Sequence, residues 1–153
     1  MYKVFDVAKY YLAKESMSPK KLQKIVYYAY GWTLALLNDS VEDLNFHLFD
    51  NRIEAWVHGP VIPDLYQEYK SYGWKAIPKL DVYAGEAFSP DVVDILEQVW
   101  GAYGSLSANQ LETISHKESP WINARNGLPA YAATTNEISD RDMFIYFNEQ
   151  ANS

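Results

Sequence analysis

Two short segments contain the residue types that could do chemistry. The first is His116-Lys117-Glu118, followed closely by Trp121. A His-x-Glu pair can relay a proton or supply two ligands to a carboxylate-rich metal site, although the paired cysteines of a zinc deaminase are missing. The alternative places His116 at the carbonyl end of one helix and Glu118 near the positive start of the next. We favour this second interpretation, because the sequence supplies both helix ends.

The second segment runs from Glu54 to Pro60 (EAWVHGP) and predicts a strand that enters a sharp turn in front of a helix. The ring of Trp56, the imidazole of His58 and free amides at a helix N-terminus could bind an anion or a peptide carboxylate. Packing explains the residues about equally well, with Trp56 in the core and Gly59-Pro60 forming the corner. The two roles are compatible.

Common catalytic motifs are absent from the sequence, which has no GxxxxGK[ST] loop and no GxGxxG, HExxH or GxSxG segment. An enzyme, such as a small hydrolase or a metal-dependent activity, stays open as an alternative centred on His58 and His116. It requires both histidines to meet in one pocket with Glu54 or Glu118.

The composition favours a protein-binding module. A formal charge of -7 over 153 residues opposes binding to nucleic acid phosphates. The absence of cysteine excludes disulfides and thiolate zinc sites. We expect neither a membrane span nor a secretory signal, and we expect a cytoplasmic protein. The chain has 13 Tyr, 5 Trp and 6 Phe, more rings than a core of this size hides easily. Such rings can serve a core or a recognition surface, and we expect most of them to be half-buried core residues with a polar tip at the surface.

The elements that position these residues are predicted to be mainly helices. Apolar residues recur at helical spacing, and Ser-Pro pairs predict helix starts at 18–19, 89–90 and 119–120. The predicted helices cover 4–14, 19–37, 63–72, 90 to Gly101 or Gly104, a short segment from Ser107, 120–125, and a last segment from Ser139.

The segments between these helices are predicted to be mostly irregular, with a short strand over 52–57. The predicted fold class is therefore mainly α. It is a compact, single-domain bundle of about six to seven helices over residues 1–153, with a minor β element near residues 46–57.

Several motifs in this order resemble the Panacea domain, the SocA-like antitoxin family that also includes phage-associated GepA-type proteins. The resemblance covers about residues 4–147, and several separate motifs in the right order are more specific than one short match. They are residues 21–32 (KLQKIVYYAYGW), 53–63 (IEAWVHGPVIP), Tyr66, 103–108 (YGSLSA) and 114–121 (ISHKESPW).

The resemblance implies a helical domain that neutralises a toxin encoded beside it. It does so by direct binding or, in one branch, by delivering the toxin to a ClpXP-type protease. It implies no catalytic residue, metal or cofactor. A further alternative is a phage-encoded regulatory protein that binds a host protein without a toxin. The bulky motif residues beside two predicted turns are the predicted partner-binding residues: Trp32, Trp56, His58, Tyr66, His116 and Trp121.

Overall fold

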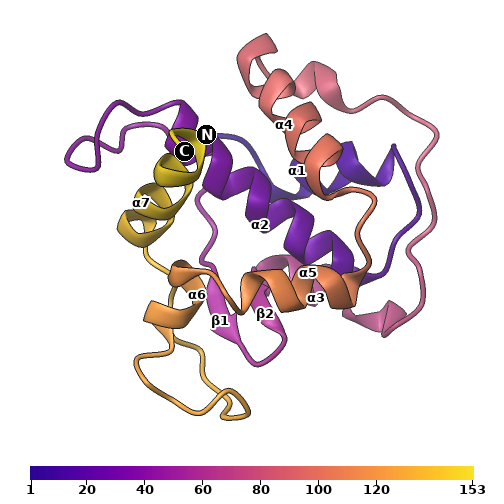
Figure 1. Ribbon diagram of the computed structural model, residues 1–153. Helices are drawn as coiled ribbons and strands as arrows, with labels where there is room; N and C mark the ends of the chain where they lie inside the picture. The colour runs from indigo at the N-terminus through magenta and orange to yellow at the C-terminus, as the bar shows by residue number, and fades with distance from the viewer.

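The computed structural model describes residues 1–153, and Figure 1 shows helices arranged around one central helix. The helices are α1 (Val4–Leu12), α2 (Pro19–Leu36), α3 (Pro63–Tyr69), α4 (Pro90–Tyr103), α5 (Ala108–Ser115), α6 (Ser119–Ala124) and α7 (Asp140–Ala151). Two short 3-10 turns are η1 (Lys70–Tyr72) and η2 (Gly85–Ala87), and strands β1 (Glu54–Trp56) and β2 (Gly59–Val61) form an antiparallel hairpin. The mainly α prediction is confirmed. No helix has both the length and the hydropathy needed to cross a bilayer.

Helix α2 is the centre of the fold, because α1, α4, α5, α7 and β2 all pack against it. Its buried residues occur on every side rather than on one stripe, which is typical of a helix enclosed by others. Gly31 makes room for α7, since a Cβ atom at this position would overlap the ring of Phe147.

At the start of three helices, a serine side chain accepts a hydrogen bond from a backbone N–H of the first turn. Such N–H groups have no partner within the helix and need a cap. Ser18 Oγ accepts from the N–H of Lys21 at 3.2 Å. Ser107 and Gln110 form a capping box at the start of α5, where the sequence predicts a short helix. Ser139 caps α7 as predicted.

The other two Ser-Pro starts differ from the prediction. Ser89 is the N-cap of α4, but its side chain makes no capping hydrogen bond. At α6 the N-cap is Glu118, and Ser119 is already the first helical residue. Proline within the first turn is therefore the shared feature of these helix starts. A backbone N–H at this position would have no partner within the helix, so its absence in proline costs no hydrogen bond.

The hairpin corrects the predicted β element. The sequence predicts one strand over 52–57 that ends at residues 58–60, whereas those last residues begin a second strand, β2. Pro60 is tolerated because α2, not another strand, lies along the outer edge of β2. There the N–H of Ile62 donates to Gln23 Oε1 at 2.8 Å. On the outer edge of β1, the N–H of Ala55 donates to the carbonyl oxygen of Asn136 at 2.9 Å. Neither edge of the hairpin is free to pair with another strand.

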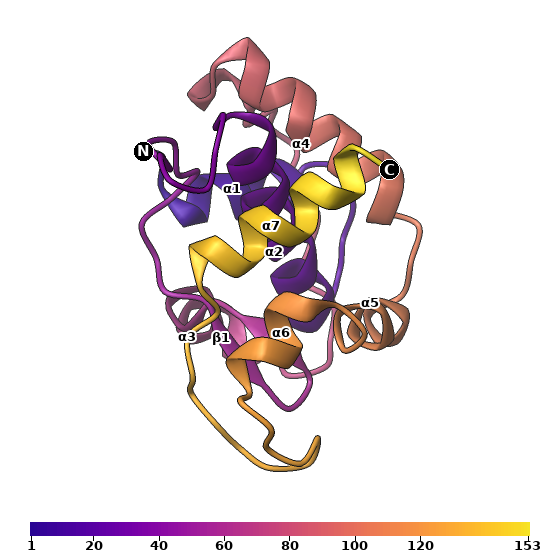
Figure 2. The same ribbon diagram turned by 60° about the vertical axis from the view of Figure 1, so that its left-hand side comes forward.

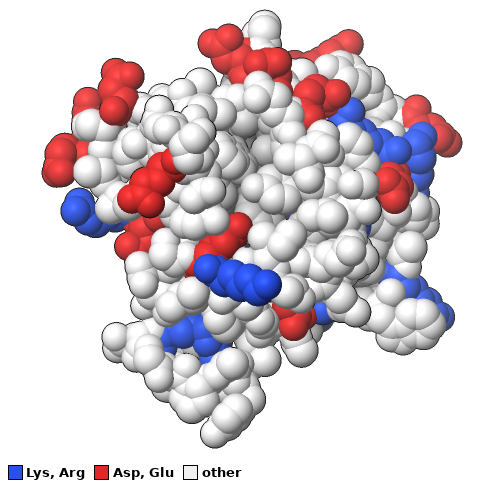
Figure 3. Space-filling model, in the orientation of Figure 1, with Lys and Arg blue, Asp and Glu red and all other residues white.

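The hairpin lies at one end of the molecule, with α3, α5 and α6 around it (Figures 1 and 2). Helix α4 and the C-terminal end of α7 lie toward the opposite end, beside the end of α2. Acidic side chains gather over α4 and over the loop that follows α2 (Figure 3). The two ends of the molecule therefore differ in charge as well as in secondary structure.

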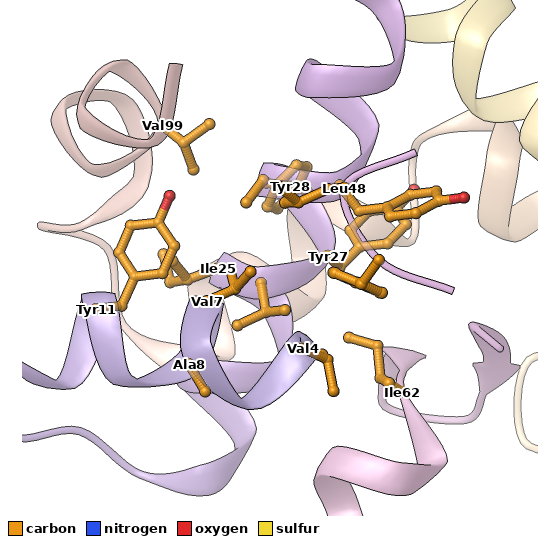
Figure 4. Packing of buried hydrophobic residues seen from close by; sticks show 14 of the residues in the cluster. Val4, Val7, Ala8, Tyr11, Ile25, Tyr27, Tyr28, Leu48, Ile62 and Val99 are labelled. Atoms are coloured by element: carbon orange, nitrogen blue, oxygen red, sulfur yellow. The ribbon is translucent and has the colours of Figure 1, made fainter. Parts of the chain in front are cut away.

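Tyrosine rings occupy a large part of the core, as Figure 4 shows for Tyr11, Tyr27 and Tyr28. The hydroxyl of Tyr11 donates to the carbonyl oxygen of Leu96 at 2.9 Å and so joins α1 to α4. The ring of Tyr28 stacks on that of Tyr103 with centroids 4.0 Å apart. The hydroxyl of Tyr11 and the stacked ring of Tyr28 thus join α1 and α2 to α4, which fixes the relative positions of these helices.

Candidate functional site

The candidate site is the end of the molecule that carries the hairpin, and its support starts at α2. Lys24 is buried beneath the hairpin, and its Nζ donates to the carbonyl oxygen of Pro60 at 3.2 Å. Burial lowers the pKa of Lys24 to about 7. Gly59 crosses over this side chain with a φ of 107°, and a Cβ atom there would lie 2.7 Å from Lys24 Cε and 2.9 Å from Ser115 Oγ. Only glycine satisfies both the backbone conformation and the contact.

Helix α6 holds the other side of the hairpin. The indole N–H of Trp121 donates to the carbonyl oxygen of Trp56 at 2.8 Å. One guanidinium N–H of Arg125 donates to the carbonyl oxygen of Ala55 at 2.8 Å. The same guanidinium lies over the ring of Trp121, 4.7 Å from its centroid. Both side chains are buried and fix the hairpin backbone through hydrogen bonds.

Arg125 also holds the loop that follows α6. Its Nη2 atom donates to the carbonyl oxygens of Pro129, at 2.9 Å, and Ala132, at 2.5 Å. One buried side chain thus links the hairpin to the loop over 129–135. Because a guanidinium carries five donors in a rigid plane, it can bind several carbonyls at once.

His116 is half-buried beneath the hairpin turn. It is the C-cap residue of α5, and its ring stacks on Trp121 with centroids 4.0 Å apart. Burial lowers its pKa, an effect that outweighs the opposing influence of Glu112. The sequence interpretation that His116 and Glu118 stand at helix ends is confirmed for their backbones, but the Glu118 side chain caps nothing.

Glu118 instead points into the core. Its carboxylate accepts from the hydroxyls of Tyr28, at 2.9 Å, and Tyr146, at 3.3 Å. Burial raises its pKa to about 7, against the opposite effect of these two hydrogen bonds. Glu118 therefore joins α2, α6 and α7 at one buried point.

Three of the predicted residues form the exposed part of the site. The rings of Trp56 and Tyr66 meet edge to face with centroids 5.1 Å apart. The indole N–H of Trp56 donates to Glu54 Oε1 at 2.8 Å. The side chain of Tyr66 is 39% exposed on α3. His58 is exposed at the tip of the hairpin, within 3.2 Å of Glu112 Oε1.

Glu112 forms a small network at the edge of the hairpin. Its Oε1 atom also lies 2.5 Å from Lys20 Nζ. Burial alone would raise the pKa of Glu112, but the hydrogen bonds from Lys20 and His58 lower it below its ordinary value. The carboxylate therefore stays charged and holds the imidazole of His58 in place.

An open groove of about 620 Å³ lies between the hairpin and the loop after α6. Sequence reasoning identified two of its lining residues and missed the others, because the loop has no periodic pattern and its contacts with the hairpin join residues that are far apart in the sequence. The lining residues are Trp56, Val57, His58, Val61, Ala133, Thr134 and Thr135.

The remaining predicted residues lie elsewhere. Trp121 is buried and His116 half-buried, so both lie beneath the groove rather than in its wall. Trp32 lies on a separate face, where its indole N–H donates to the hydroxyl of Tyr103 at 2.9 Å. The structure therefore brings five of the six residues to one end of the molecule and places Trp32 apart from them.

The two histidines of the enzyme alternative make different side-chain contacts. His58 pairs with Glu112 at the surface, whereas His116 stacks on Trp121 below it. Glu118 is bound by tyrosine hydroxyls in the core. The chain brings no group of three or more His, Asp or Glu side chains together in a metal-binding arrangement.

Comparison with known proteins places the chain in a family. The family described as "Antitoxin SocA-like, Panacea domain" matches residues 22–122, a range that includes all six predicted partner-binding residues. Antitoxin SocA of Caulobacter vibrioides (strain NA1000 / CB15N) is 33% identical over 117 residues, which cover 69% of this chain and 58% of that protein. The chain thus matches less than two thirds of the relative's length. No solved structure matches the chain. This chain belongs to the SocA-like antitoxin family of Panacea domains.

Proposed function

We propose that this chain is an antitoxin that neutralises a toxin protein by binding it directly, with the hairpin end of the molecule as the contact surface. Membership of an antitoxin family is the observation that carries the proposal. The name of the relative describes that protein alone and does not identify the toxin that this chain binds. The proposal places the binding in the cytoplasm, which the cysteine-free sequence allows.

The exposed side chains of the hairpin end support this choice of surface. Trp and Tyr are the residue types that most often dominate binding energy at protein interfaces. Trp56 is held by its own hydrogen bond to Glu54 and by contact with Tyr66, so little side-chain freedom remains to be lost on binding. His58 and the adjacent groove extend the same surface. His116 and Trp121 support it from below.

The test is growth of cells that express the gene next to this one, with and without this chain. A neighbour that stops growth alone and is tolerated together with this chain would support the proposal, provided that the two proteins co-purify. A harmless neighbour would contradict it and would favour a regulatory protein that binds a host protein without a toxin.

The same cells distinguish direct inhibition from proteolytic delivery. If the chain inhibits the toxin by binding alone, the amount of toxin stays constant while growth recovers. If the chain works as an adaptor for a ClpXP-type protease, the toxin disappears as growth recovers, and it reappears in cells that lack the protease. Immunoblotting of the toxin in both strains separates the two outcomes.

A further inference from the structure

A second surface lies away from the hairpin. It is an apolar groove of about 320 Å³ among α2, α4 and the C-terminal end of α7. Figure 3 shows an uncharged hollow between α4 and the end of α7. Six of its lining residues are Trp32, Leu36, Ile95, Val99, Ala102 and Tyr103.

The floor of this groove is held rigid by aromatic contacts. The indole N–H of Trp32 donates to Tyr103 Oη at 2.9 Å, and its ring packs against Phe147 with centroids 5.2 Å apart. Tyr103 stacks in turn on Tyr28. Leu36 stays 44% exposed at the edge of the groove. The groove is thus preformed and offers apolar surface without any rearrangement of its walls.

The residues that line the groove carry no charge, and acidic side chains lie at its edges, while Lys21 donates to the carbonyl oxygen of Gly104 at the C-terminal end of α4. Residues 25–51, 80–116 and 142–153 contain no Lys or Arg, and these stretches supply all of its lining. Asp94 marks the α4 edge, where it accepts from the side chain of Gln98 at 3.0 Å. Glu149 lies on the last turns of α7. Neither Asp94 nor Glu149 forms a salt bridge, so both charges are free to act on a partner.

We propose that this groove binds an amphipathic helix of a protein partner that carries Lys and Arg on either side of an apolar stripe. The walls are helices without a strand edge, and helices pack side chains of a third helix between their own ridges. From Ile95 to Tyr103 the groove follows α4 for about 12 Å, which matches two turns of a bound helix. The acidic edges then face the basic flanks of that helix.

The charge of the chain argues against other occupants. Two copies that met through their acidic edges would place like charges together, with a formal charge of -7 on each. Nucleic acids and anionic lipids would be repelled by the same edges. The inference concerns a surface separate from the hairpin end and does not depend on the identity of the toxin.

A peptide-binding experiment on the full chain tests the inference. The probe is a fluorescent helical peptide of about five turns, with Leu along one face and Lys on both flanks. A second peptide has Glu in place of every Lys. Leu36→Glu blocks the groove but adds a negative charge, so it separates apolar docking from charge attraction. Leu128→Glu is the matched control, because Leu128 is 42% exposed and lies in the loop after α6.

We expect the basic peptide to bind the unaltered chain, and the Glu peptide to bind at least about tenfold more weakly. Leu36→Glu should weaken binding of the basic peptide at least about tenfold, while Leu128→Glu leaves it within about twofold. Ala102→Glu, at another exposed groove position, should act like Leu36→Glu. Circular dichroism establishes that each variant is folded.

Three results would overturn the inference. The first is that the basic peptide binds both groove variants as tightly as the unaltered chain, or more tightly, which would mean that charge attraction alone holds the peptide. The second is equal binding of the Glu peptide, or no binding of either peptide. The third is a dimer of the unaltered chain that Leu36→Glu dissociates, which would assign the groove to a second copy. None of these results tests toxin binding by the hairpin end, because the experiment contains no toxin.

Discussion

The buried Trp121 of α6 donates its indole N–H to the carbonyl oxygen of the half-buried Trp56 at the end of β1, at 2.8 Å. The two tryptophans thus have different roles within one end of the molecule. Trp121 fixes the backbone, and Trp56 presents its ring to the surface. This difference leads to separable predictions for stability and for binding.

Trp121→Phe should lower stability, because the carbonyl oxygen of Trp56 loses its donor while the apolar ring is retained. The expected loss in the free energy of unfolding is about 1–3 kcal/mol, measured by urea denaturation. Unchanged stability would show that water or another donor replaces the indole at no cost.

Trp56→Ala should weaken toxin binding by about 2 kcal/mol or more, or roughly thirtyfold in Kd, because a half-buried and oriented ring is lost from the proposed contact surface. The measurement is titration of the toxin against each purified variant. Trp74→Ala is the control, since Trp74 is 86% exposed and does not line the groove beside the hairpin. If both variants bind as tightly as the unaltered chain, the hairpin end is not the contact surface.

Gly59→Ala should destabilise the fold by about 2–3 kcal/mol, because the new Cβ meets a strained backbone conformation and the buried Lys24 together. Gly127→Ala shares a positive φ, of 80°, but no atom lies near its Cβ position. It should cost only about 1 kcal/mol. Thermal or urea unfolding measures the loss of stability in each variant. Equal losses would show that the contact with Lys24 does not contribute.

Glu118→Gln should change how stability depends on pH. Burial raises the pKa of Glu118 from 4.5 to about 7, so between these values the folded chain holds the proton more tightly than the unfolded chain. The contribution of this carboxyl to stability is therefore full below pH 4.5 and falls as pH rises to about 7. The glutamine variant does not lose this contribution, so its free energy of unfolding should rise relative to that of the unaltered chain between pH 4.5 and 7. Parallel stability profiles in urea at these pH values would contradict the prediction.

Helix positions could be predicted from the sequence because they depend on local patterns. Apolar spacing and the Ser18-Pro19 start identify α2, and the capping box at Ser107 identifies the start of α5. Strand β2 was missed, since proline and glycine usually end strands. Here Lys24 supplies the hydrogen bond to Pro60, and that contact comes from a distant part of the sequence.

The candidate site could be predicted only in part. The motif residues identify the hairpin end, but residue type does not reveal that Trp121 is buried while Tyr66 is exposed. Both outcomes depend on how α3 and α6 pack against the hairpin. Trp32 shares the aromatic character of the others, yet the direction of α2 places it at a separate groove.

Binding of the purified chain to the product of the neighbouring gene tests the central claim most directly. Isothermal titration and size-exclusion chromatography should show a stable complex in which both proteins remain intact, and Trp56→Ala should weaken it while Trp74→Ala does not. Absence of any complex with a neighbour that is toxic to cells and is rescued by this chain would contradict neutralisation by direct binding.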